Sequence, residues 1–503
     1  MKRKVFSVLG VMPEPGGYAI AKFSRTPTYK SYLDWAMELT TEGAEKFYNT
    51  IYFQYGHSSI ADLAHLMVVL ENISVPARNL LLDEQLIDVQ SRSTRYVDYS
   101  KCVFIIPPEI RKDKTALKLL NKNCRQMADL YALILEKVSQ TYCREYLPKR
   151  PKTISEEDCQ RITRVRAIDI ARYLLPCAIP KSMGVYASAR TWEKIITKFS
   201  SSDLKEFQEI GKDLQKAICQ KQAINPSISK LDQVDWLSKN QKKKLANLLF
   251  GKNIGLPTLV KYAQAKDYPK VAFNKIKKLV SELKIKEKPD GERGVELFER
   301  LDPEIDFVTT LFYKISPYSF GQILKAVKAK GKKFCQKVID LAFADRGGHD
   351  QAMRELAVGN LTFDVCMDIG GFRDLHRHRN CIQILKELTP DFGYDLPEEV
   401  KKVGLEKEFQ KVMADSEKAY WQIEKKYPRI GQYFLAQAHR RRFLMRMSPW
   451  EVQYITELRS RPQGHYSYRE IAFLMYKEFA KKYPRLAKHI RVTNPEVVDF
   501  FKR

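Results

Sequence analysis

The stretch Arg373-Asp374-Leu375-His376-Arg377-His378-Arg379-Asn380 follows a largely apolar run from Phe363 to Phe372. Two of its arginines flank a histidine within three residues, and each guanidinium is permanently charged and carries five donors. Such a cluster is unfavourable against an apolar core, whereas phosphate and carboxylate groups offset its desolvation through planar, bidentate hydrogen bonds. We therefore expect a buried element to end here and to present Arg377 and Arg379 at a surface or cleft that binds an anion.

Related motifs in the first half of the chain indicate a tandem duplication. Gly56-His57 precedes Ser93-Thr94-Arg95-Tyr96 there, and Gly348-His349 stands ahead of the arginine-rich stretch in the second half. The closing motifs agree in spacing, because from Ser188 to Glu209 is 21 residues and from Ser448 to Glu470 is 22. An internal repeat of this length predicts two copies of one domain.

The expected fold class is α+β, with two tandem copies of a helix-rich domain built on a central antiparallel sheet and related by a pseudo-twofold axis. Leu66–Leu70 and Cys102–Ile106 have the pattern of strands, and Ala116–Val138 has that of an amphipathic helix. The predicted organisation is a first copy over residues 1–223, a lysine-rich helical connector over 224–304 and a second copy over 305–503.

Composition limits the classes of function. The formal net charge of +27 favours polyanionic partners such as nucleotides or nucleic acid, although a lysine-rich, solvated surface gives the same excess. Arg440-Arg441-Arg442 is interpreted as part of such a solvated face. No apolar stretch approaches the length of a membrane helix. Nine cysteines without close pairing predict free thiols in the cytoplasm and argue against a structural zinc site.

These motifs together resemble the family of flavin-dependent thymidylate synthases, also described as thymidylate synthase-complementing proteins. That family carries Gly-His followed by an acid, Arg-His-Arg running on into Ser-x-Arg-Tyr, then Arg-x-x-Leu-Pro and Asn-Ala-Arg. The chain is similar to two fused, unequally diverged copies of the family domain. The resemblance implies reductive methylation of dUMP to dTMP, with FAD as cofactor and NADPH and methylenetetrahydrofolate as co-substrates.

The resemblance also implies a role for each matching residue. Arg377 and Arg459 would be catalytic, because a cation must polarise the uracil so that its carbon 6 accepts hydride. The implied nucleotide contacts are Arg377, Ser93, Arg95, Arg172 and Arg459. The implied flavin contacts are His378, Arg379, Ser59, Asp62, Ser188 and Arg190. The resemblance implies no cysteine nucleophile, and no metal is expected, because no acid or cysteine pair supports His376 and His378 at ligand spacing.

The two copies have lost different parts of the family pattern. The first copy has Asp83-Glu84-Gln85 at the Arg-His-Arg position, and the second has Gln432 at the Arg-x-x-Leu-Pro arginine. We therefore consider a composite site that joins the Arg377–Arg379 triplet to Ser93 and Arg95, in a chain that dimerises as a pseudo-tetramer. Arg172 and Arg459 could instead belong to the second, non-equivalent site.

Two other functions fit the same sequence. The chain could be a catalytically inactive paralogue that binds a nucleotide or a protein partner. It could also bind nucleic acid through its positive charge, in which case its affinity would fall steeply with salt.

Overall fold

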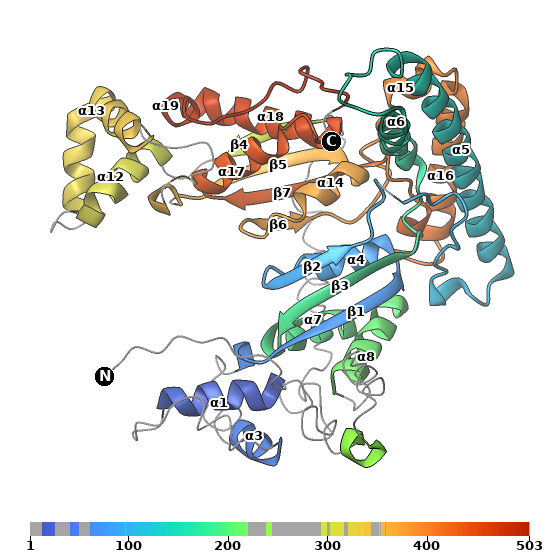
Figure 1. Cartoon of the computed structure of the whole chain (residues 1–503), viewed down its shortest axis with the longest axis horizontal. Coiled ribbons are helices and arrows are strands. Elements are labelled where there is room, and N and C mark those ends of the chain that lie inside the picture. The colour runs from blue at the N-terminus through green and yellow to red at the C-terminus, as the bar shows by residue number, and fades with distance from the viewer. Residues whose placement is uncertain are drawn as a thin grey trace. The chain divides into compact units, whose positions relative to one another are not determined.

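The computed structural model describes residues 13–25, 41–49, 61–95, 97–219, 238–243, 293–298, 302–315, 320–343, 352, 354–357 and 359–501. The chain divides into two compact units (Figure 1). Unit 1 comprises Met1–Ile73, Ala77–Arg92 and Lys181–Lys286, and unit 2 comprises Ser74–Pro76, Ser93–Pro180 and Glu287–Arg503. In the described ranges, no helix is both long enough and apolar enough to cross a membrane.

Unit 1 contains a three-stranded antiparallel sheet in the order β1-β3-β2. Its strands are β1 (His65–Ile73), β3 (Lys181–Ser188) and β2 (Ile87–Ser91). Ser188 caps the helix that follows β3, because its hydroxyl accepts from the Thr191 backbone N–H at 3.3 Å. The helices whose bounds fall in or next to this unit are α1 (Pro13–Arg25), α3 (Thr41–Phe47), α4 (Val75–Leu82), α7 (Ala189–Ser200) and α8 (Lys205–Cys219).

Unit 2 contains a four-stranded antiparallel sheet in the order β4-β5-β7-β6, and α18 packs against β4 and β5 (Figure 1). Buried aromatic and aliphatic side chains such as Phe363, Phe372 and Phe443 form the core between sheet and helices. The strands are β4 (Gly294–Phe298), β5 (Leu361–Asp368), β6 (Ile382–Leu385) and β7 (Arg440–Met447). The surrounding helices are α12 (Pro303–Ile315), α13 (Phe320–Phe343), α14 (Ile369–Leu375), α17 (Pro449–Arg459), α18 (Tyr466–Lys482) and α19 (Pro484–Ala487).

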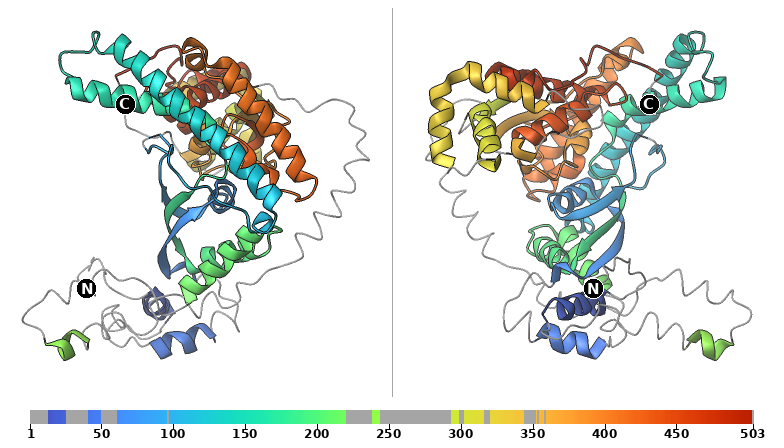
Figure 2. Two further views of the ribbon diagram at one scale, coloured as in Figure 1. Left: turned by 90° about the vertical axis from the view of Figure 1, so that its right-hand side faces the viewer. Right: turned by 60° about the vertical axis from the view of Figure 1, so that its left-hand side comes forward.

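A second core in unit 2 joins long helices from both halves of the chain. α5 (Lys114–Tyr146) runs beside α6 (Glu156–Ala171) and α16 (Glu406–Glu424), as Figures 1 and 2 show. Asn123 and Ser416 both donate to the Phe434 carbonyl oxygen, at 2.9 and 2.8 Å. The short helix α15 (Glu398–Lys402) lies against α5. Residues 93–180 of the first half therefore fold together with the second half, and the compact units do not coincide with the two sequence repeats.

The order of elements repeats along the chain. The series β1, α4, β2, a helical excursion, β3, α7 and α8 has the same order as β5, α14, β6, a helical excursion, β7, α17 and α18. In each sheet the last of these strands lies between the other two of its series. A 3₁₀ helix precedes that strand in both cases, η4 (Arg172–Leu174) and η7 (Gly431–Phe434). The mixed helix and sheet content is as predicted, and this order agrees with a duplicated arrangement. The pseudo-twofold axis stays a prediction.

The local predictions were correct in part. Leu66–Leu70 lies within β1 and Ala116–Val138 lies within α5. Cys102–Ile106 is not a strand, because Pro107 and Pro108 follow it and carry no N–H, and its Ile105 N–H donates to the Ala178 carbonyl oxygen without a strand beside it. Most of the predicted connector lies outside the described residues. Of its described residues, 239–243 are helical, 294–298 form β4, which pairs with β5, and 303–304 begin α12.

The interpretation of Arg440-Arg441-Arg442 as a solvated face was wrong. These residues begin β7, where Arg441 is buried with its guanidinium 4.2 Å from the centre of the Phe372 ring. Arg440 and Arg442 form ion pairs with Asp395 at 2.6 Å and with Asp364 at 2.9 Å. Because each cation has a specific partner, this run belongs to the fold of the sheet.

Candidate anion-binding site

The arginine-rich stretch begins inside a buried helix and ends at the surface. All residues of α14 are buried, and Asp368 caps the helix by accepting from the Gly371 N–H at 2.5 Å. Beyond the helix, His376 and His378 are buried, whereas Arg377 and Arg379 are exposed. This alternation matches the expectation that a buried element ends here and presents the two cations.

Five arginines and two carboxylates lie close together around this point, all of them in unit 2. We call this group the arginine cluster. Two of its arginines come from the first repeat and three from the second. Its members are Arg95, Arg172, Arg373, Arg377 and Arg459, with Asp169 and Asp374.

Asp169, at the end of α6, pairs with two arginines from its own repeat. Arg95 binds it through two hydrogen bonds, Nε to Oδ1 at 2.9 Å and Nη2 to Oδ2 at 3.1 Å. Arg172 approaches the same carboxylate only to 4.0 Å, although its side chain is fully buried. Within the described part of the chain, none of the three guanidinium nitrogens of Arg172 has a hydrogen-bond partner. A buried cation in this state lacks the acceptors that normally offset its desolvation.

Asp374 is the second carboxylate of the cluster, and Arg377 contacts it at 3.3 Å. Burial would raise the pKa of Asp374, but the positive charges of Arg377, Arg172, Arg95 and Arg459 outweigh this effect and lower the pKa. The carboxylate therefore stays ionised and is shared among several cations.

Burial and neighbouring charges shift the pKa values of the arginines in opposite directions. The charge of Asp169 raises the pKa of Arg95 above its ordinary value, against the effect of burial. Burial, followed by the charge of Arg172, instead lowers the pKa of Arg373 to about 9. Burial also lowers the pKa of Arg459. Five guanidinium groups face two carboxylates, so the cluster has an excess of positive charge that an anion would neutralise.

Residues from distant elements hold the cluster in place. The phenol of Tyr468 on α18 accepts from Arg95 Nη1 at 3.2 Å, and its ring lies 5.7 Å from the Arg459 guanidinium. Arg373 donates to the Thr94 hydroxyl. Ser93 accepts from the Arg95 backbone N–H at 3.1 Å, so its hydroxyl shapes the turn that carries Arg95.

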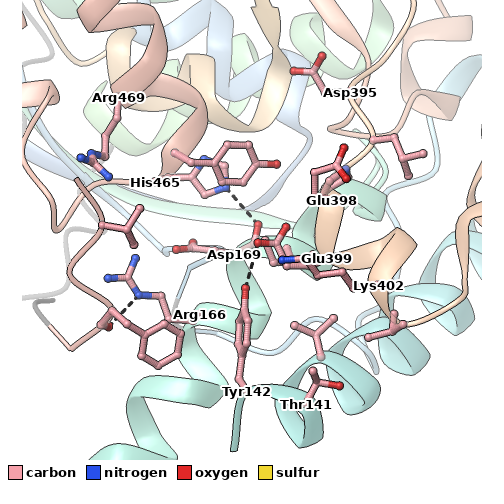
Figure 3. Close-up of a pocket in the computed structure, with 18 of the residues that line it drawn as sticks. Thr141, Tyr142, Arg166, Asp169, Asp395, Glu398, Glu399, Lys402, His465 and Arg469 are labelled. Carbon is pink, nitrogen blue, oxygen red and sulfur yellow. Dashed lines mark hydrogen bonds between the residues drawn. The ribbon is translucent and has the colours of Figure 1, made fainter. Parts of the chain in front are cut away.

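A cavity of about 580 Å³ in unit 2 shares Asp169 with the arginine cluster. Asp169 and His465 line it, and in Figure 3 the His465 ring points toward the Asp169 backbone oxygen, 3.3 Å from Nε2. Figure 3 also shows Tyr142, another lining residue, donating to Glu399. Burial and then the charge of Arg172 lower the pKa of His465 well below its ordinary value, so this imidazole is neutral. Where the cavity borders the arginine cluster, its lining therefore consists of the neutral imidazole of His465 and of Asp169, whose carboxylate is paired with Arg95.

The residues implied for flavin binding are divided between the units. In unit 1, Asp62 receives hydrogen bonds from Ser188 at 3.3 Å and from Arg190 at 3.0 Å, so these three side chains come together. Ser59 lies outside the described residues, as do His57, Tyr96 and His349.

In unit 2, Arg379 is exposed, but both ring nitrogens of His378 already have protein partners. Among the described residues of either unit taken alone, the implied set does not by itself form a donor array that fits FAD.

Sequence reasoning did not identify every member of the cluster. Arg373 and Asp374 stand in the quoted stretch, and Asp169 precedes Arg172 by three residues on the same helical face, a spacing that could have indicated an ion pair. Tyr468, which holds two of the arginines, gave no such signal, because its contacts with Arg95 and Arg459 depend on the packing of α18 against residues far away in the sequence. Among the described residues, no group of histidine, cysteine and acidic side chains has the arrangement of a metal site.

Comparison with known proteins gives a consistent assignment. A UPF0159 protein of Thermoplasma acidophilum is 25% identical over 94% of this chain and 94% of its own length. A UPF0159 protein of Chlamydia muridarum is 23% identical over 92% of the chain and 83% of its own length. A flavin-dependent thymidylate synthase of Clostridium tetani is 27% identical over 31% of the chain and 58% of its own length. The family described as thymidylate synthase complementing protein matches residues 12–222 and 316–485, more than half of the sequence and one segment in each repeat. The chain therefore belongs to the thymidylate synthase complementing protein family.

Proposed function

We propose that the arginine cluster is a nucleotide site and that the chain carries out reductive methylation of dUMP to dTMP. The observation that carries this proposal is the excess of guanidinium groups in the cluster, with Arg172 fully buried and without hydrogen-bond partners among the described residues. A nucleotide phosphate supplies several charged acceptors, which is what such a set of donors lacks.

The composition of the cluster supports one composite site per chain. Arg95 and Arg172 come from the first repeat, and Arg377 and Arg459 come from the second, yet all four affect the pKa of Asp374. In the second repeat, Gln432 stands at the position of Arg172. In the first repeat, Asp83-Glu84-Gln85 stands at the position of the Arg377–Arg379 triplet. Neither position offers an equivalent cation. Our proposal assigns Arg172 and Arg459 to the same site as Arg95, and not to a second one.

In this proposal some arginines bind the phosphate of dUMP and another stabilises charge on its uracil ring. Arg95, Arg172 and Arg377 bind the phosphate. Arg459 stabilises the negative charge that develops on the uracil when its carbon 6 accepts a hydride, as an electrostatic contribution to catalysis. Family membership supports FAD as the cofactor, which supplies the redox chemistry when bound.

NADPH and methylenetetrahydrofolate as co-substrates, a dimeric assembly and a cytoplasmic location belong to the same proposal. The flavin contacts of Arg379, Asp62, Ser188 and Arg190 remain predictions from the sequence, and we assign no step to them.

The test is conversion of dUMP to dTMP by the purified protein with FAD, NADPH and methylenetetrahydrofolate, together with rescue of a thymidine-requiring strain. We expect Arg95→Gln and Arg377→Gln each to abolish both activities. Arg161→Gln is the matched control, because Arg161 is an exposed α6 arginine that pairs with Asp158. Binding of dUMP without turnover would identify an inactive nucleotide-binding paralogue, and full activity of either cluster variant would refute the composite site.

A further inference from the structure

A buried hydrogen-bonded chain leads from Glu451 through His378 to Arg459. Glu451 Oε1 lies 3.3 Å from His378 Nδ1, and both side chains are 3% exposed. On the other side of the ring, Arg459 Nε donates to His378 Nε2 at 2.8 Å. The chain begins and ends on α17, because Glu451 lies in its first turn and Arg459 in its last.

The arginine fixes the tautomer of the histidine. A guanidinium nitrogen can only donate, so His378 Nε2 must offer a lone pair to Arg459. A neutral imidazole carries one N–H, which must then be on Nδ1 and point to Glu451. Burial, opposed by the hydrogen bond to Glu451 and assisted by the charge of Arg459, lowers the pKa of His378. The ring is therefore neutral, with Nδ1–H as its donor.

This tautomer determines how Arg459 is held. Nε is tied to the histidine, and among the described residues neither Nη nitrogen has a hydrogen-bond partner. The guanidinium lies 5.7 Å from the Tyr468 ring centre, which restrains its plane. The two Nη groups thus belong to a guanidinium that His378 and Tyr468 hold in place, and they have no acceptor among the described residues.

We propose that Glu451 is a positioning residue: by accepting from His378 Nδ1–H it anchors the imidazole ring, so that Nε2 holds Arg459 Nε and the Nη groups of Arg459 stay in place to bind the nucleotide. The ligand half of this inference rests on the proposed function, while the tautomer half stands on the contacts alone. His378 then acts through Arg459 and does not itself contact a flavin.

The experiment measures two quantities on the full chain, dUMP affinity by calorimetry and the ¹⁵N signals of His378 by NMR. Glu451→Ala removes the acceptor, whereas Glu451→Gln keeps an oxygen that can accept from Nδ1–H. Glu457→Ala is the control, because that α17 carboxylate accepts from the Arg491 backbone N–H instead. Thermal unfolding of each variant confirms that it is folded.

We expect the wild type, Glu451→Gln and Glu457→Ala to show the Nδ1–H tautomer and to bind dUMP within about threefold of one another. Glu451→Ala leaves His378 Nδ1–H without its carboxylate acceptor, so the ¹⁵N signal of Nδ1 should shift from its wild-type position, and dUMP should bind about tenfold more weakly, or about 1.4 kcal/mol. An Nε2–H tautomer in the wild type would overturn the proposal, as would unchanged dUMP affinity in a folded Glu451→Ala protein. If the wild type shows the Nδ1–H tautomer but does not bind dUMP, the nucleotide function fails while the arrangement of Glu451, His378 and Arg459 stands.

Discussion

Replacing Arg172 with methionine should make the protein more stable and at the same time unable to bind dUMP. Arg172 is fully buried, and its guanidinium nitrogens have no hydrogen-bond partners among the described residues. Its distance of 4.0 Å from Asp169 is too long for a hydrogen bond, and Arg95 already pairs with that carboxylate through two bonds. Removal of Arg172 therefore leaves no carboxylate unpaired. It also removes the electrostatic repulsion between Arg172 and neighbouring arginines such as Arg373.

The expected gain follows from comparable replacements. Exchanging a buried ionic group for an apolar side chain of similar volume stabilises proteins by up to about 1–4 kcal/mol. We predict a gain in that range for Arg172→Met without ligand. Arg95→Met is the contrasting variant, because it strips Asp169 of its bidentate partner, and breaking a buried pair costs about 3–5 kcal/mol.

The assay is denaturant unfolding of the two variants and the wild type, with and without dUMP. A change in midpoint at constant slope reports the change in the free energy of unfolding. Saturating dUMP should stabilise the wild type, by about 2.7 kcal/mol at 100 times the dissociation constant, and should leave both variants unaffected. Destabilisation of Arg172→Met by more than about 2 kcal/mol, or stabilisation of it by dUMP equal to that of the wild type, would refute the reasoning.

Three further outcomes are expected. Asp374→Asn should lower the free energy of unfolding by about 3–5 kcal/mol, because several cations lose a shared counter-ion. Since folding lowers the pKa of Asp374, the contribution of this carboxylate to the free energy of unfolding is complete above its unfolded pKa of 3.8 and is lost as the pH falls below that value. A difference between Asp374→Asn and the wild type that exists only above neutral pH would contradict this. Gly371→Ala should destabilise by about 1–3 kcal/mol in thermal unfolding, because the added Cβ would lie 2.6 Å from the Ser467 hydroxyl oxygen, and an unchanged midpoint would argue against this packing. The purified protein should show flavin absorbance near one FAD per chain, and a colourless protein that does not take up FAD would contradict FAD as the proposed cofactor.

Local patterns were sufficient to predict the elements that rely on neighbouring residues. The apolar periodicity of Ala116–Val138 predicted part of α5, and the repeated motifs predicted the repeated order of elements. The change from the apolar run to the Arg377–Arg379 triplet also located the end of α14. Each of these signals lies within one segment or in the spacing of two segments.

Features that depend on tertiary contacts could not be predicted in the same way. Arg441 is buried because the Phe372 ring lies beneath it, which no feature of the arginine run itself reveals. Cys102–Ile106 has the composition of a strand but lies next to prolines and lacks a neighbouring strand. The meeting of Arg95 with Tyr468 brings together residues 373 positions apart, so only the fold could show that cations from both repeats share one location.

The most direct test of a composite site is the number of dUMP molecules bound per chain in the wild type, Arg95→Gln and Arg459→Gln. One site built from both repeats predicts one dUMP per chain in the wild type and none at the same concentrations in either variant. Two dUMP molecules per chain, with one retained after loss of either arginine, would contradict it, because each repeat would then hold a complete site of its own.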